Sequence, residues 1–166
     1  GCRMAFAIET QIVTSPGGIT AWLVESHAIP MISMDFAFDG GTALDPPGKE
    51  GAVTLMTALM DEGAADMDSA AFQAKVIDLN MYQSFRADTE NMAGSLTLLS
   101  KNREQSFALL KKALTAPRFD AEPVERMRSA QVQSVMQSMA EQNTIAARAW
   151  FATAFPGHAY TRPTDG

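Results

Sequence analysis

The sequence is poor in the residue types that build metal centres and disulfides. Its 166 residues include one cysteine, Cys2, and two histidines, His27 and His158. One cysteine excludes a disulfide within the chain. Both histidines fall in polar turns and lie far apart in the sequence, so we expect them to be exposed and not to share a zinc ion on one helix.

Several functional motifs are missing as well. The sequence has no phosphate-binding loop, no cysteine-rich metal motif and no recognisable Ser-His-Asp set. The net charge is −6 and the sequence contains no cluster of basic residues. Both features argue against a nucleic-acid or anionic-membrane partner. No apolar run reaches the length of a transmembrane helix. The acidic residues are scattered and indicate a solvated surface.

The first residues carry no visible signal peptide, because Gly1-Cys2-Arg3-Met4 follows no apolar segment. A Gly-Cys start is typical of a trimmed chain and also of the lipid-bearing end of a processed bacterial lipoprotein. The second alternative predicts a periplasmic or envelope-associated location.

Composition and pattern together predict an α+β fold. The chain is 46% hydrophobic and 19% charged, as in ordinary globular domains. Apolar alternation and helical spacing predict three strands, two helices, two more strands and three helices. This order suits one mostly antiparallel sheet with helices on one side. The expected strands are 11–14, 19–25, 31–38, 81–87 and 91–99. The expected helices are one that carries 52–60, one from the cap at Asp68 to about Leu79, one that carries Phe107, Leu110 and Leu114 and ends before Pro117, one that begins at Asp120, and one that follows 142–144.

Local signals mark several helix ends. Asp68 and Asp120 are expected N-caps, and Asn80 is an expected left-handed stop. The methionines at helical spacing are predicted to be core residues because they share stripes with Leu and Val. These methionines are Met56, Met60, Met127, Met136 and Met139.

The most informative stretch runs from Gly40 to Gly63. A glycine-rich turn containing Pro46-Pro47-Gly48 leads into an apolar helix, and Gly63 follows it as an expected stop. The helix has an apolar stripe, formed by Ala52, Leu55, Met56, Leu59 and Met60. The pattern by itself predicts a core helix.

This stretch resembles the active-site helix of the insulinase, pitrilysin and mitochondrial processing peptidase family. Those zinc peptidases carry H-x-x-E-H on a helix entered through a similar turn. Laid on this sequence, the histidines fall on Thr54 and Ala58 and the glutamate on Thr57. None of the three groups needed for metal binding and general-base catalysis is present.

The resemblance extends from about Ile12 to Gly166. In the family, a further glutamate ligand lies on a helix opened by a Glu-Arg pair, which Glu125-Arg126 resembles here, and the ligand position falls on Ser134. His158 to Pro163 resembles the turn that follows that helix. The resemblance therefore implies that residues 1–166 form a single, incomplete N-terminal peptidase-like domain, without the C-terminal part of the family architecture.

The resemblance implies two alternative functions. In the two-subunit peptidases of the family, one chain holds zinc while the other closes the chamber and contacts the peptide, so this chain would bind no cofactor and pair with a zinc-bearing homologue. Alternatively, it is a purely structural member with no peptide role. An enzyme of another type on the same fold has no supporting residue set.

The resemblance also implies a possible peptide contact. In the family, an extended substrate adds as an extra strand to a sheet edge. The residues expected at that edge here are Asn91, Met92, Ala93, Gly94 and Ser95.

Overall fold

A computed structural model describes residues 9–166. The expectations for Gly1 to Met4, including Cys2 lipidation, lie outside this range. The chain divides between Pro30 and Met31 into two compact units, which we describe separately. The prediction of one incomplete domain stays a prediction. The division into two units does not contradict it, because a two-stranded hairpin does not form a stable domain by itself.

The first unit contains a hairpin. Strands β1 (Thr10–Thr14) and β2 (Thr20–Val24) pair antiparallel, with Ile12 opposite Trp22. The turn between them is closed by hydrogen bonds from Ser15 N to Ile19 O and from Gly18 N to Ser15 O. Both strands were predicted within one or two residues.

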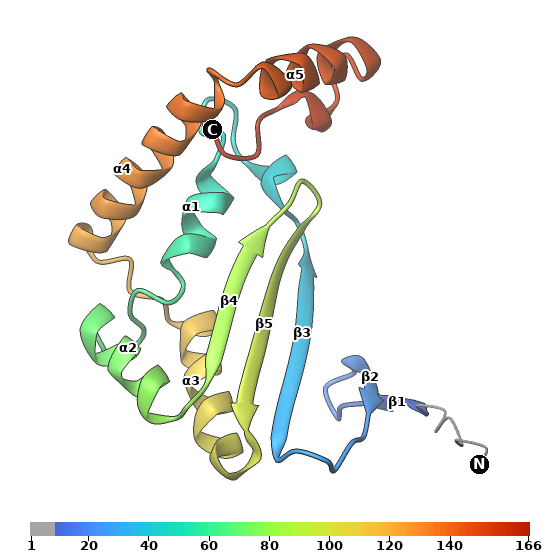
Figure 1. The fold of residues 1–166 in the computed structure, drawn as a ribbon, viewed down its shortest axis with the longest axis vertical. Coiled ribbons are helices and arrows are strands. Elements are labelled where there is room, and N and C mark those ends of the chain that lie inside the picture. The colour runs from blue at the N-terminus through green and yellow to red at the C-terminus, as the bar shows by residue number, and fades with distance from the viewer. Residues whose placement is uncertain (1–8) are drawn as a thin grey trace, which may run out of the picture. The chain divides into compact units, whose positions relative to one another are not determined.

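The second unit contains a three-stranded antiparallel sheet in the order β3-β5-β4 (Figure 1). Its strands are β3 (Met31–Asp39), β4 (Tyr82–Ala87) and β5 (Asn91–Leu99). The predicted α+β class is confirmed. The antiparallel strands are distributed over two sheets where one was expected, because β1 and β2 pair with each other.

The helices follow the predicted order. The α-helices are α1 (Ala52–Leu59), α2 (Ser69–Asp78), α3 (Arg103–Thr115), α4 (Ala121–Ser138) and α5 (Gln142–Ala154), and the short 3-10 turns are η1 (Thr42–Leu44), η2 (Ser100–Asn102) and η3 (Ala159–Thr161). Asp68 caps α2 by accepting a hydrogen bond from Ala71 N, and Asn80 adopts a φ of 48° after its end. Asp120 does not cap α4 through its side chain, because its carboxylate instead accepts hydrogen bonds from Arg118.

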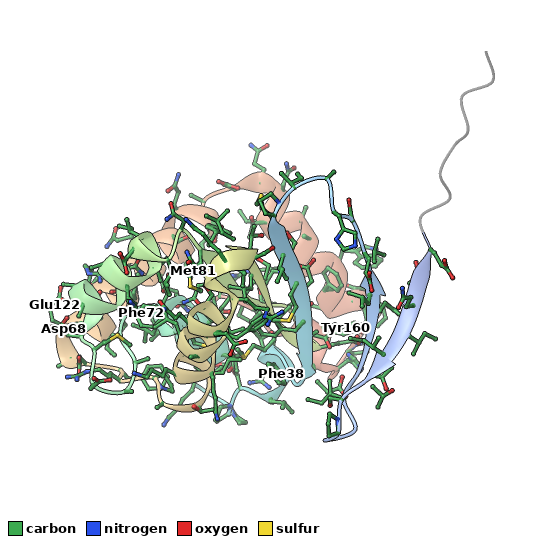
Figure 2. All side chains as sticks on the ribbon, turned by 90° about the horizontal axis from the view of Figure 1, so that it is seen from below. Phe38, Asp68, Phe72, Met81, Glu122 and Tyr160 are labelled. Atoms are coloured by element: carbon green, nitrogen blue, oxygen red, sulfur yellow. The ribbon has the colours of Figure 1, made fainter. Side chains whose placement is uncertain are left out.

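One face of the three-stranded sheet is apolar and the other is polar. Leu96 and Leu98 of β5 pack with Phe72 of α2 and with Leu109 and Leu110 of α3 in the core. In Figure 2, Phe72 and Met81 lie among these helices, whereas Asp68 and Glu122 lie at the surface. The opposite face carries hydroxyl pairs, Ser33 with Thr97 and Ser84 with Ser95. Because one face is polar, the helices gather on the other.

A glycine in the central strand makes room for an aromatic ring. Gly94 lies opposite Phe36, and a Cβ at Gly94 would come within 2.4 Å of the Phe36 ring. Phe36 also packs edge-on against Phe85 of β4 and Phe38. Phe38 itself is 50% exposed, so the buried face of β3 does not extend to the end of this edge strand.

Two of the five methionines predicted as core residues are on the surface. Met60 is buried, and Met56 and Met127 are half-buried, but Met136 and Met139 are 63% and 55% exposed. Periodicity identified their helix stripe correctly; within residues 9–166, however, no neighbouring element covers this part of α4.

Candidate functional site

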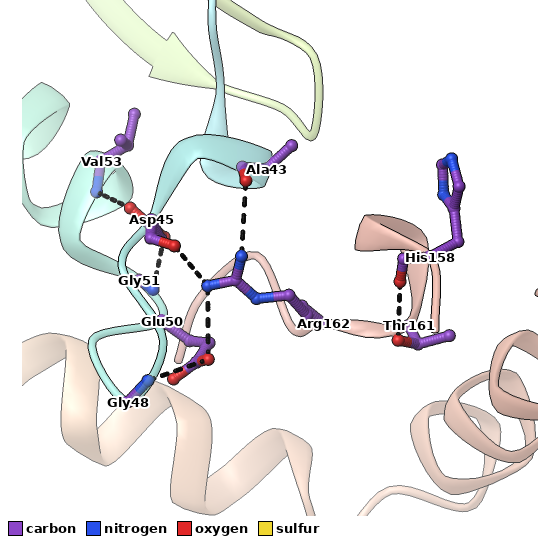
Figure 3. Close-up of polar contacts among 9 residues, drawn as sticks. All are labelled: Ala43, Asp45, Gly48, Glu50, Gly51, Val53, His158, Thr161 and Arg162. Atoms are coloured by element: carbon purple, nitrogen blue, oxygen red, sulfur yellow. Dashed lines mark hydrogen bonds and ion pairs between the residues drawn. The ribbon is translucent and has the colours of Figure 1, made fainter. Parts of the chain in front are cut away.

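The entrance of α1 is built around one buried carboxylate. Asp45 is 3% exposed, and its two oxygens accept hydrogen bonds from Gly51 N at 2.8 Å and Val53 N at 2.9 Å (Figure 3). These N–H groups belong to the first turn, where an α-helix has no internal acceptors. Gly51 has a φ of 87°, and a Cβ there would lie 2.5 Å from Asp165 O. The Pro-Gly turn and Asp45 together fix where α1 begins.

Arg162 connects this entrance to the end of the described chain. Its guanidinium donates to Ala43 O at 3.4 Å and Asp45 O at 2.5 Å, and it pairs with the Glu50 carboxylate at 3.3 Å (Figure 3). The N–H groups of Glu50 and Gly48, together with the nearby Arg162 charge, hold the pKa of Glu50 below its usual value. The segment after α5 is therefore fastened to the loop before α1.

The hydroxyl groups at the predicted active-site positions make structural contacts. Thr54 Oγ1 donates to Thr164 O at 2.5 Å, and Thr57 Oγ1 donates to Thr54 O at 2.8 Å within the helix. Thr57 is 5% exposed, whereas Ala58 is exposed and offers only a methyl group. Neither hydroxyl lies against a base that would activate it as a nucleophile.

These roles give a prediction for stability. Thr57→Ala should lower the free energy of unfolding by less than about 1 kcal/mol, because the lost bond is internal to α1 and alanine favours helix. Leu55→Ala should cost about 1–2 kcal/mol, less than the loss expected for a fully buried leucine, because Leu55 is only half-buried. Urea unfolding measures the decrease in the free energy of unfolding for both variants. A larger decrease for Thr57→Ala than for Leu55→Ala would contradict the prediction.

The structure packs α4, which carries Ser134, against α1. Gln131, one turn before Ser134, donates from Nε2 to Gly51 O at 3.0 Å and to Asp165 O at 2.7 Å. Ser134 lies beside this contact stripe and is exposed. The two helices that carry the four predicted positions are thus neighbours, as the resemblance implied.

The donor groups at these positions do not fit zinc. Structural and catalytic zinc sites use Cys, His, Asp or Glu, and Thr54, Ala58 and Ser134 supply none of these. Among residues 9–166, no group of three or more such side chains is placed to hold a metal ion. His27 is 89% exposed, and His158 caps η3 by accepting from Tyr160 N. No catalytic step can therefore be derived through a metal at this position.

The predicted peptide-pairing edge is wrong. Asn91 to Ser95 belong to β5, which pairs with β3 on one side, and Met92 to Ser95 also pair with β4 on the other. Backbone groups of a central strand are already used in two ladders, so an incoming strand has no partner there. In this sheet the edge strands are β3 and β4.

Two hollows were not predicted from the sequence. The apolar groove, about 460 Å³, lies between the start of α1 and the second half of α4 and is lined chiefly by Leu55, Val132, Val135, Met136 and Met139. The polar cleft, about 330 Å³, lies between α5 and the segment after it. Its lining side chains include Thr89, Thr144, Arg148, Phe151, Tyr160, Arg162 and Asp165. Each hollow is lined by segments that are far apart in the sequence, so no local motif predicts it.

Among the described residues, no helix is long and apolar enough to cross a bilayer.

The fold and the α1–α4 arrangement define a peptidase-like domain, and sequence comparison assigns its family. The sequence model of the insulinase family, peptidase family M16, matches residues 23–166. The chain belongs to this family.

Three relatives illustrate the similarity. The Helicobacter pylori protein named non-peptidase homolog YmxG is 25% identical over 126 residues, which cover 74% of this chain and 28% of that protein. A crystal structure of a peptidase M16 inactive domain from Pseudomonas fluorescens has a TM-score of 0.87 at 22% identity, covering 96% of this chain and 39% of that one. The structure of a protease from Helicobacter pylori has a TM-score of 0.79 at 14% identity, with the same coverage.

The two solved structures confirm the fold. The chain spans 28% of the length of the curated relative and 39% of each solved chain. Similarity over such a part assigns the domain and its architecture.

Proposed function

We propose that this chain is a non-catalytic insulinase-family subunit that pairs with a zinc-bearing homologue and helps to enclose peptide substrates. The observation that carries this proposal is that α1 and α4 are packed as in the family but lack its catalytic side chains. The fold keeps both helices in contact, while Thr54, Thr57, Ala58 and Ser134 replace every group that zinc hydrolysis requires. The name of the Helicobacter pylori relative, a non-peptidase homologue, supports the same conclusion.

A peptide contact is proposed at a different strand from the one first expected. Strand β4 lies next to α1 and, among residues 9–166, is hydrogen-bonded to a strand on only one side. A free strand edge can accept an extended peptide through backbone hydrogen bonds. Tyr82 and Arg86 of β4 are exposed, which leaves side chains available for peptide contacts.

The proposal is tested with the full-length protein and a co-expressed family member that carries H-x-x-E-H. We expect the two chains to co-purify and zinc-dependent peptide cleavage to require both. A control pair carries a partner whose glutamate in that motif is changed to glutamine, and it should assemble without cleaving. If the zinc-bearing chain is fully active alone and never associates with this protein, the purely structural alternative replaces this proposal.

Metal binding gives a second prediction. This protein alone should hold no stoichiometric zinc and cleave no peptide, because its four family positions supply no suitable ligand. Elemental analysis after purification in the presence of a weak chelator measures this. One tightly held zinc per chain, lost in Thr54→Val or Ser134→Ala, would contradict the assignment of these positions.

The same positions can be rebuilt. Thr54→His, Thr57→Glu, Ala58→His and Ser134→Glu together should confer zinc binding if α1 and α4 have the family register. We expect this binding to be weak, because ligand orientation depends on supporting hydrogen bonds that the four substitutions do not supply. A matched variant with asparagine at 54 and 58 and glutamine at 57 and 134 should bind none. Equal zinc binding by the two variants would show that the ion lies elsewhere.

A further inference from the structure

We infer that the polar cleft binds the free carboxylate at the C-terminus of a peptide, with Arg148 as the principal partner of that carboxylate. This inference deepens the proposed function and rests on it for the choice of a peptide as ligand. The cleft lies between α5 and residues 160–165; Thr54 of α1 does not line it but hydrogen-bonds to the backbone of Thr164, which does.

The two arginines that line the cleft differ in their contacts. Arg162 is already used, because its guanidinium donates to two carbonyl oxygens and pairs with Glu50. Arg148 is different: its only ion pair among the described residues is with Asp165, at 3.6 Å. That distance is too long for a hydrogen bond, so the donors of Arg148 lack a close acceptor in residues 9–166.

The side chains around Arg148 suit a carboxylate. The cleft is also lined by the hydroxyl-bearing side chains of Thr89, Thr144 and Thr164. A guanidinium forms paired, charge-assisted hydrogen bonds with a carboxylate, and neighbouring hydroxyl groups can donate to the same oxygens. Asp165 is the only acidic side chain among the described lining residues, and the Glu90 carboxylate is already engaged by the hydroxyl of the lining residue Tyr160. An anion that binds Arg148 therefore has to displace only the loose Asp165 ion pair.

The cleft is small and has one aromatic wall. A volume of about 330 Å³ is at the small end of ligand sites and suits a terminal residue better than a long segment. Phe151 lines one side and packs against the rings of Trp150 and Phe155. A carboxylate attached to an apolar side chain matches both the guanidinium and the aromatic wall.

The test uses fluorescence polarisation with the full-length protein and N-terminally labelled Ala-Ala-Phe peptides. The peptide with a free C-terminal carboxylate should bind at least about tenfold more tightly than the same peptide as an amide, since a bidentate charge-assisted contact is lost in the amide. Arg148→Gln should reduce the affinity for the acid to that of the amide. Arg103→Gln is the matched control, because Arg103 is an exposed arginine of α3 whose ion pair within the described chain is with its neighbour Glu104.

A second variant is expected to increase the affinity for the free acid. Asp165→Asn removes the competing carboxylate but keeps the backbone carbonyl that Gln131 contacts, so it should tighten binding of the acid several-fold. Circular dichroism melting confirms that each variant is folded. Equal affinity for acid and amide, or no effect of Arg148→Gln, would overturn the inference.

The remaining outcomes separate this inference from the proposed function. Binding that inorganic phosphate or acetate abolishes at equal concentration would show a general anion site and overturn the assignment to a peptide end. If the protein binds the free acid through Arg148 but never pairs with a zinc-bearing chain, the cleft assignment stands and the subunit proposal fails. If the pair cleaves peptides but Arg148→Gln changes no affinity, only the cleft assignment fails.

Discussion

Replacing Phe72 with alanine should lower the free energy of unfolding by about 3–5 kcal/mol. Phe72 is fully buried and belongs to the cluster that joins α2, α3 and β5. Removing its ring deletes contacts in a densely packed region and leaves a cavity that neighbouring side chains fill only in part. For a domain of about 150–250 residues the loss corresponds to a fall of roughly 6–20 °C in the melting temperature.

Ile77→Ala is the matched control for this prediction. Ile77 lies on the same helix but is 74% exposed, so its truncation should change stability by less than about 1 kcal/mol. Both variants are compared by urea unfolding and by thermal melting. Similar losses at the two positions would mean that α2 does not pack through the face described for it.

The Phe72 position was predictable because its signal is local. Phe72, Val76 and Leu79 recur at helical spacing, Asp68 precedes them as an N-cap, and Asn80 follows as a left-handed stop. Each of these features depends on residues within one or two helical turns. The strands and α-helices were expected within a few residues for the same reason.

The position of β5 was not predictable in this way. Alternation identifies a strand but does not say which strands flank it, so an edge was expected where the structure has the centre of the sheet. One signal was present in the sequence: Met92, Ala93 and Gly94 are consecutive small or apolar residues, and all three are buried. A run buried on both faces is typical of an inner strand.

The polar contacts of the candidate site join residues too distant in the sequence for any motif. Arg162 reaches Asp45 across 117 positions, and Thr54 reaches Thr164 across 110. The resemblance aligned α1 and α4 and so identified which groups are missing. It could not show that the Thr54 hydroxyl holds α1 to the segment after α5, or that Gln131 holds α4 to the start of α1 and to that same segment.

Asp45→Ala should lower the free energy of unfolding by about 2–4 kcal/mol, the second large effect that the structure implies. The variant leaves the N–H groups of Gly51 and Val53 without their acceptor at a buried helix start. A lost helix cap costs about 0.5–2 kcal/mol, and each buried polar group left unsatisfied costs about 1–3 kcal/mol. The Arg162 contact survives in the variant because it involves the backbone carbonyl of residue 45.

Two further variants distinguish capping from a general effect of charge. Asp45→Asn keeps one oxygen acceptor but turns an amide N–H₂ toward the other donor, so its stability should lie between wild type and Asp45→Ala. Glu50→Gln changes a charge in the same turn, whose contacts are with Arg162 and Gly48 N, and should cost less than about 1 kcal/mol. Urea unfolding gives the three values, and amide hydrogen exchange should show the loss of protection beginning in the first turn of α1. That turn contains Thr54 and borders the apolar groove. Equal losses of stability in Asp45→Ala and Glu50→Gln would mean that the Asp45 cap does not fix α1 in its position against α4.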